Sequence, residues 1–124
     1  MKIFLLCLLA VFFISPAQAQ TGSVSTLPSG KYTTIVPENQ AHWEMGDIIL
    51  LEDNKYKLTT SGEVGDYKFS YVAQRVFFTS GPLKNVYARI LLTDNNPSIL
   101  IPRNENEQKG LKMVTADVMG VYRH

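Results

Sequence analysis

Apolar and polar residues alternate with a period of two along much of this chain, which is the pattern of β-strands with one buried face. Tyr67, Phe69 and Tyr71 are the clearest case, because three aromatic side chains share one face. Residues 55–60 and 86–92 alternate in the same way. No long stretch shows the period of about 3.6 residues that an amphipathic helix requires. The pattern therefore predicts an all-β fold.

Turn residues interrupt these segments at short intervals. Asp94-Asn95-Asn96-Pro97 is the strongest turn signal, since Asp and Asn tolerate the dihedral angles of tight turns. Gly62 and Gly65 predict a turn at 61–66, and residues 103–110 predict a polar loop. Strands are expected near residues 31–36, 47–52, 55–60, 67–72, 75–80, 85–93, 98–102 and 111–118. This order favours a single antiparallel meander of seven to eight short strands that closes into a small barrel or sandwich.

The first nineteen residues have the pattern of an export signal. Lys2 gives a positive start, residues 3–14 are apolar, and Ala17-Gln18-Ala19 provides the small residues that signal peptidase recognises. The apolar segment is shorter than the ~20 residues that span a bilayer. We expect a signal peptide at 1–19 cleaved after Ala19, a flexible leader at 20–29 and a β domain at 30–124. The mature protein is then secreted or periplasmic.

Composition and charge exclude several function classes. One of the twelve Lys and Arg residues lies in the signal, so eleven remain against eleven Asp and Glu in the mature chain. Without a basic stripe, nucleic acid is not an expected partner. No second apolar stretch predicts a membrane span after cleavage. The only cysteine, Cys7, also lies in the signal, and a cysteine-free exported domain favours a bacterial origin.

Residues that would indicate catalysis or metal binding are sparse. The mature chain has no cysteine nucleophile, and it has only two histidines, His42 and His124. Glu38, His42 and Glu44 offer at most two or three metal ligands within one loop. We therefore expect no metal, no cofactor and no catalysis. The alternative is a small extracytoplasmic hydrolase that uses His42 and acidic residues of the 37–47 loop.

Aromatic residues are the better candidates for binding. Trp43 lies beside His42 in a long connection, and Tyr32, Tyr56 and Tyr87 lie near predicted strand ends. An indole in such a loop can contact a ligand at the mouth of a barrel, or it can plug the barrel as part of the core. We expect Trp43, His42, Tyr32 and Tyr56 to form the ligand site, and the ligand to be small and apolar.

Three predicted strands are apolar on both faces, at residues 48–51, 76–78 and 90–92. Such strands imply a second layer above the sheet or an interface with another molecule. The aromatic and aliphatic residues that we expect in the core by default are Phe69, Phe77, Phe78, Ile90 and Leu92. If these strands form an interface, the chain binds either a protein of the cell envelope or a second copy of itself. The expected function is thus an exported, non-catalytic binding or structural module that holds a small apolar ligand or a protein partner.

Residues 67–83 carry a short family-like pattern. A strand led by Tyr67 and Phe69 precedes a segment of the form Val-x-Phe-x-Ser-Gly-Pro-Leu, here Val76 to Leu83. This segment resembles a pattern of small secreted bacterial β-rich proteins. The resemblance implies an exported lipocalin-like or sandwich β domain. It implies no catalytic residues, because that group has no agreed activity.

Overall fold

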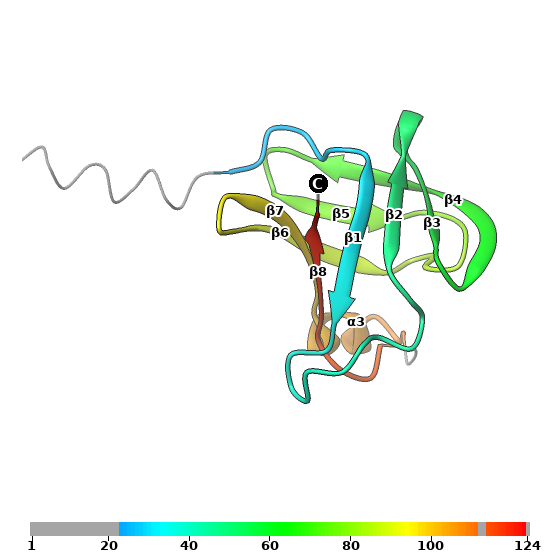
Figure 1. The fold of residues 1–124 in the computed structure, drawn as a ribbon. Helices are drawn as coiled ribbons and strands as arrows, with labels where there is room; N and C mark the ends of the chain where they lie inside the picture. Colours follow the sequence, from blue (N-terminus) through cyan, green and yellow to red (C-terminus); the bar gives the residue numbers. More distant parts are fainter. Residues whose placement is uncertain (1–22, 112–113, 124) are drawn as a thin grey trace, which may run out of the picture.

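The computed structural model describes residues 23–111 and 114–123, which form a closed antiparallel β-barrel (Figure 1). The strands are β1 (Gly30–Ile35), β2 (Ile48–Leu51), β3 (Lys55–Leu58), β4 (Ser61–Ser70), β5 (Arg75–Phe78), β6 (Tyr87–Thr93), β7 (Asn96–Ile101) and β8 (Val118–Tyr122). Each strand pairs with its neighbour in sequence, and β8 returns to pair with β1. The predicted all-β meander is confirmed, and of the two closures considered the chain adopts the barrel.

Alternate side chains of each strand fill the interior of the barrel. Tyr32, Tyr56 and Phe78 are fully buried there, with 0% of their surface exposed. The rings of Tyr56 and Phe78 pack edge to face, with centroids 4.8 Å apart. Full burial of a large apolar side chain contributes roughly 1.5–3 kcal/mol. The period-two pattern of the sequence therefore marks the residues that hold the barrel together.

The hairpin between β6 and β7 follows the turn chemistry of the sequence. Asp94 and Asn95 both have positive φ angles, 52° and 68°, as a two-residue hairpin turn requires. Asn96 and Pro97 already belong to β7, where they pair with the end of β6. The predicted turn is confirmed, but it consists of two residues and not of the four residues of the motif.

The predicted turn at 61–66 is wrong, because these residues begin the long strand β4. Gly65 lies where the strand contacts a neighbouring loop, and a Cβ atom there would be 2.3 Å from the carbonyl oxygen of Ser80. The glycine therefore serves a close backbone approach and not a turn. The pairing of β3 with β4 also shifts register between Tyr56 and Leu58, which accommodates the longer strand.

The end of the chain also differs from the prediction. The expected polar loop at 103–110 contains a short helix, α3 (Arg103–Gln108), and the last strand runs over Val118–Tyr122 instead of 111–118. The helix begins where the carboxylate of Asp117 accepts a hydrogen bond of 2.7 Å from the backbone N–H of Arg103. This cap comes from a residue 14 positions away, so local sequence does not reveal it. Residues 112 and 113 of the predicted strand lie outside the described residues.

The segment before β1 contacts the other end of the barrel, at the top of Figure 1. Val24 is buried, and its backbone N–H and carbonyl bond to the side-chain amide of Gln74 at 2.8 and 2.9 Å. The carbonyl of Pro28 accepts a hydrogen bond of 2.8 Å from the Tyr32 hydroxyl. Part of the expected leader is thereby held against the barrel. The predicted signal peptide lies outside the described residues.

Candidate functional site

The four residues expected to bind a ligand do not meet at one surface. Tyr32, Tyr56 and Trp43 belong to the buried core, with 0%, 0% and 8% of their surface exposed. His42 is exposed. A ligand that contacted all four residues would have to enter the packed interior. The structure brings three of them together as core, and their role in binding stays a prediction.

The two buried tyrosines have internal hydrogen-bond partners. The hydroxyl of Tyr56 donates to the carbonyl of Ser80 and accepts from the backbone N–H of Leu83, both at 2.7 Å. Burial raises the pKa of Tyr56 to about 12 and that of Tyr32 further. Both hydroxyls are therefore neutral at physiological pH. The Tyr56 hydroxyl fixes the loop before β6, and the Tyr32 hydroxyl fixes the segment before β1.

The alternative hydrolase site is not assembled by the described residues. Within residues 23–111 and 114–123, no hydrogen bond or ion pair joins His42 or Glu44 to another side chain. The same ranges contain no group of three His, Cys, Asp or Glu side chains that could hold a metal ion. A general base requires a partner that orients it. No observation therefore favours the hydrolase hypothesis.

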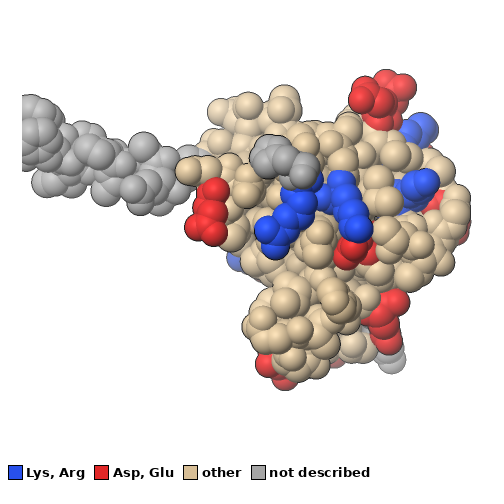
Figure 2. All heavy atoms as spheres, in the orientation of Figure 1, with Lys and Arg blue, Asp and Glu red and all other residues tan. Residues whose placement is uncertain are grey.

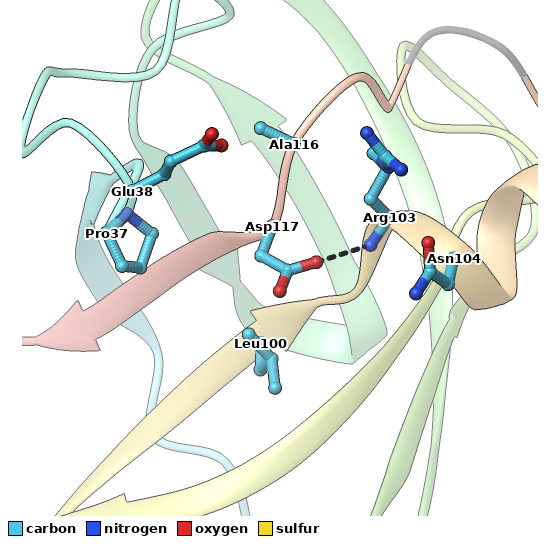
Figure 3. Close-up of a pocket in the computed structure, with 7 residues that line it drawn as sticks. All are labelled: Pro37, Glu38, Leu100, Arg103, Asn104, Ala116 and Asp117. Carbon is cyan, nitrogen blue, oxygen red and sulfur yellow. Dashed lines mark hydrogen bonds between the residues drawn. The ribbon is translucent and has the colours of Figure 1, made fainter.

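One cavity of about 510 Å³ lies at the end of the barrel next to α3 (Figure 3). Its lining is Pro37, Glu38, Leu100, Arg103, Asn104, Ala116 and Asp117. Figure 3 shows Asp117 between Glu38 and Arg103, with its carboxylate bonded to the Arg103 backbone. The N-cap residue Pro102 supplies no side-chain cap, so Asp117 satisfies this end of the helix. The central polar group of this cavity thus has a structural role.

A larger cavity, of about 690 Å³, lies on the outer wall of the barrel. We call it the outer groove, and its lining is Ser70, Ala73, Arg75, Phe77, Tyr87, Glu105, Gln108 and Lys109. Strands β4, β5 and β6 form its floor, and α3 with the residue after it forms one side. Its volume falls within the roughly 300–1,000 Å³ of ligand sites in proteins. The outer groove is our candidate functional site.

An aromatic pair forms the floor of the outer groove. Phe77 and Tyr87 lie directly opposite each other on β5 and β6, and their rings meet edge to face with centroids 6.1 Å apart. Phe77 keeps 43% of its surface exposed, because Val76 and Phe78 are the residues of this strand that point inward. Phe77 was expected in the core, and that expectation is wrong. Tyr87 is half-buried, and an aromatic pair that is partly accessible in a concave wall is typical of a binding site.

Positive charges surround this aromatic pair. The Lys109 ammonium lies 4.2 Å from the centre of the Phe77 ring, and the Arg75 guanidinium lies 5.2 Å from that of Tyr87. Neither cation forms an ion pair with any carboxylate of the described residues. Both therefore retain a positive charge that an anionic group can engage.

The acidic group of the outer groove is already engaged. Glu105 on α3 forms an ion pair with Arg89 on β6. Hydrogen bonding to Tyr87 and to Glu105 raises the pKa of Arg89, so its guanidinium stays charged at every physiological pH. The charge of Glu105 is therefore balanced by Arg89, and Arg75 and Lys109 remain available to an anionic ligand.

Helix α3 is fixed over the groove by one buried side chain. Asn106 is 0% exposed, and its amide accepts from the Tyr87 N–H at 2.8 Å and donates to the Tyr87 carbonyl at 3.0 Å. A second donor bond of 2.7 Å reaches the carbonyl of Pro102. These bonds join the helix to the edge of the aromatic pair. The walls of the groove are therefore preformed.

The outer groove differs from the face shown in Figure 2. That face, over β1 and β2, carries basic and acidic side chains next to one another. Lys31 and Asp47 form one such pair, with 3.5 Å between ammonium and carboxylate. Surface pairs of this kind contribute little to stability or recognition. The outer groove differs from this mixed surface because its two cations lie against an aromatic pair.

Sequence reasoning identified Tyr87 as a binding candidate but missed the other residues of the outer groove, although one signal pointed to them. The segment Val76-Phe77-Phe78 is apolar on both faces, which predicted an interface without locating it. Period two could have separated Phe77 from Val76 and Phe78, because in the structure it lies on the opposite face of β5. The contribution of Lys109 has no local signal, because it depends on how α3 packs against β6.

Comparison of the chain with models of protein families, with characterised proteins and with solved structures gives no match. Among the described residues, no helix has the length and apolar character needed to cross a membrane. The functional interpretation therefore depends on the geometry of the barrel and its outer groove.

Proposed function

We propose that this protein is a non-catalytic binding module that captures its ligand in the outer groove. The ligand has an apolar part that contacts Phe77 and Tyr87 and an anionic part that contacts Arg75 and Lys109. The single observation that carries this proposal is the aromatic pair of exposed Phe77 and half-buried Tyr87, flanked by two cations without carboxylate partners. This chemistry modifies the small apolar ligand expected from the sequence by adding a negative charge.

The packing of the barrel supports an outer site over an inner one. The eight-stranded meander has the strand order of the lipocalins, whose ligands bind inside the barrel. Here Tyr32, Tyr56 and Phe78 occupy the interior with 0% exposure. An inner ligand would have to displace these side chains. We therefore propose that the relation to lipocalin-like secreted proteins extends to strand order, while the binding surface is external.

We also propose that the protein works outside the cytoplasm, in the periplasm or the medium. The support is the sequence pattern of residues 1–19, with a basic start, an apolar segment and small residues at the cleavage site. Cleavage after Ala19 leaves four residues, Gln20 to Ser23, ahead of the buried Val24. Mass spectrometry of the exported protein tests this expectation, since it gives the first residue directly.

The dye ANS (anilinonaphthalene sulfonate) tests the binding site, because it combines an aromatic part with a negative charge. We expect ANS fluorescence to rise on binding to the native protein, and Phe77→Ala to weaken binding by roughly tenfold. Leu91→Ala is the matched control, since Leu91 is 40% exposed on the outer face of β6 but does not line the groove. Equal losses in both variants, or no loss in Phe77→Ala, would reject the proposed site.

A further inference from the structure

We infer that the occupant of the outer groove is an acidic peptide segment of a partner protein, with an aromatic or aliphatic side chain among its acidic residues. This inference rests on the proposed function, because it names the ligand of the same groove. It follows from the shape of the groove, from its charge and from the exposed residues at its end.

The groove is elongated, as an extended peptide requires. A second cavity of about 320 Å³ adjoins it and shares Phe77 and Lys109 with it. This cavity continues the groove to Asn85 and Leu111. A compact ligand would fill one of the two cavities and leave the other to water. A peptide several residues long contacts both.

The charges of the groove favour an acidic occupant. Arg75 and Arg89 lie directly opposite each other on the outer faces of β5 and β6. Like charges in this position destabilise a sheet unless an anion lies near them. Glu105 compensates Arg89 alone, so Arg75 and Lys109 remain for carboxylates of the partner. Lys68, opposite Phe77 on β4, adds a further positive charge beside the groove.

Exposed apolar residues extend the contact surface past the groove. Ser70 and Ala73 line its end, and between them the hairpin tip carries Tyr71 and Val72. Val72 is 92% exposed and Tyr71 is 55% exposed. A small ligand confined to the groove would not contact these side chains. A peptide that leaves the groove at this end can cover them, as in complexes that bind a peptide in an extended conformation.

The concave shape favours a peptide over a lipid surface. Helix α3, held to β6 by Asn106, forms one side of the groove, so Phe77 and Tyr87 lie on a floor at the foot of the helix. A flat membrane reaches protruding side chains and cannot reach this floor. A single extended chain is narrow enough to enter. We therefore assign the positive charge to acidic side chains and not to anionic headgroups.

Selection from a random peptide library on the purified, immobilised protein tests the inference. We expect enrichment of peptides in which Asp and Glu flank an aromatic or aliphatic residue. Fluorescence anisotropy with one enriched, labelled peptide then gives the Kd. Arg75→Gln and Lys109→Gln should each weaken binding by about tenfold and reduce its salt dependence. Lys57→Gln on β3, outside the groove, is the matched control and should leave the Kd unchanged.

Several outcomes would overturn the inference. These are enrichment of peptides without acidic residues, and enriched peptides that bind the Arg75→Gln and Lys109→Gln variants as tightly as the native protein. Sedimentation of the protein with vesicles of phosphatidylcholine and phosphatidylglycerol, but no peptide binding, would assign the groove to lipid. A dimer abolished by Phe77→Ala would assign it to a second copy. If ANS still binds through Phe77 in these cases, the outer groove remains the site and only the peptide assignment fails.

Discussion

Arg75 and Arg89 lie directly opposite each other on the outer wall of the barrel, and of the two only Arg89 contacts a carboxylate of the described residues, that of Glu105. Opposed like charges cost a sheet about 0.2–1 kcal/mol, so stability alone does not favour Arg75 at this position. Its charge is consistent with the binding role that we propose for it. Under the proposed function, the charge of Arg75 serves recognition and not the stability of the fold.

The first prediction separates these two roles of Arg75. In Arg75→Gln, the loss of the contact with Tyr87 costs about 0.5–1 kcal/mol, and relief of the repulsion from Arg89 offsets a similar amount. We expect the free energy of unfolding in urea to change by less than about 0.5 kcal/mol, while ANS binding weakens. A large loss of stability with unchanged ANS binding would make Arg75 a structural residue.

The second prediction concerns the close approach at Gly65. A Cβ atom there would meet the carbonyl oxygen of Ser80 at 2.3 Å and the Cα of Gly81 at 2.8 Å, and backbone atoms cannot rotate away. We expect Gly65→Ala to destabilise the barrel by at least about 2 kcal/mol. The control is Gly62→Ala on the same strand, where nothing lies within 4 Å of the added Cβ. Circular dichroism melts of the two variants measure the difference in Tm, and similar Tm values would contradict the packing described.

The third prediction concerns the buried hydroxyl of Tyr56. Tyr56→Phe leaves the Leu83 N–H and the Ser80 carbonyl without their partner, which should cost about 1–3 kcal/mol. Urea unfolding at neutral pH measures this loss. Tyr71→Phe, at an exposed hydroxyl, is the control and should leave stability unchanged.

The same residue predicts a loss of stability at alkaline pH. The pKa of Tyr56 is raised from 10.0 to about 12 in the folded protein, so between these values the unfolded chain ionises first. The contribution of Tyr56 is therefore complete below pH 10 and is lost as the pH rises through about 12. In Tyr56→Phe this part of the alkaline decline should disappear. An unchanged decline would show that the hydroxyl is not protected by the fold.

The fourth prediction concerns acid. Hydrogen bonds from the Lys55 ammonium at 2.6 Å and the Ser80 hydroxyl at 2.9 Å lower the pKa of Asp66 below its ordinary value. A lowered pKa gives stability that is present above the ordinary value of 3.8 and is lost as the pH falls through the folded value. Asp66→Asn should therefore flatten the decline of stability below about pH 4. Asp94→Asn, in an exposed turn, is the control and should keep the native decline.

The fold was largely predictable, because each strand carries its own pattern. Alternation at residues 55–58 and the turn at Asp94-Asn95 fix local structure without help from distant parts of the chain, although the strand ends two residues before the predicted limit of 60. The predictions are wrong where contacts with residues distant in sequence determine the local structure. Local sequence marks Gly65 as a turn residue, whereas in the fold the Ser80 carbonyl lies against it. Helix α3 begins because Asp117 caps it from beyond the helix.

The candidate site was less predictable for the same reason. Aromatic residues near loops, such as Trp43, suggested binding, but the structure gives Trp43 8% exposure. Phe77 carried a usable signal in its place opposite Val76 and Phe78. The arrangement of Lys109 over Phe77 depends on the packing of α3, which no local pattern encodes.

The central claim is that ligands bind the outer wall of the barrel and not its interior. An NMR chemical-shift map of the ¹⁵N-labelled protein, saturated with ANS, tests it most directly. We predict shifted amides at residues 75–77, 87–89 and 105–111, with the amides of Tyr32 and Tyr56 unchanged. Shifts concentrated at Tyr32, Tyr56 and Phe78, with those of β5, β6 and α3 on the outer face unaffected, would contradict the claim and place the ligand inside the barrel.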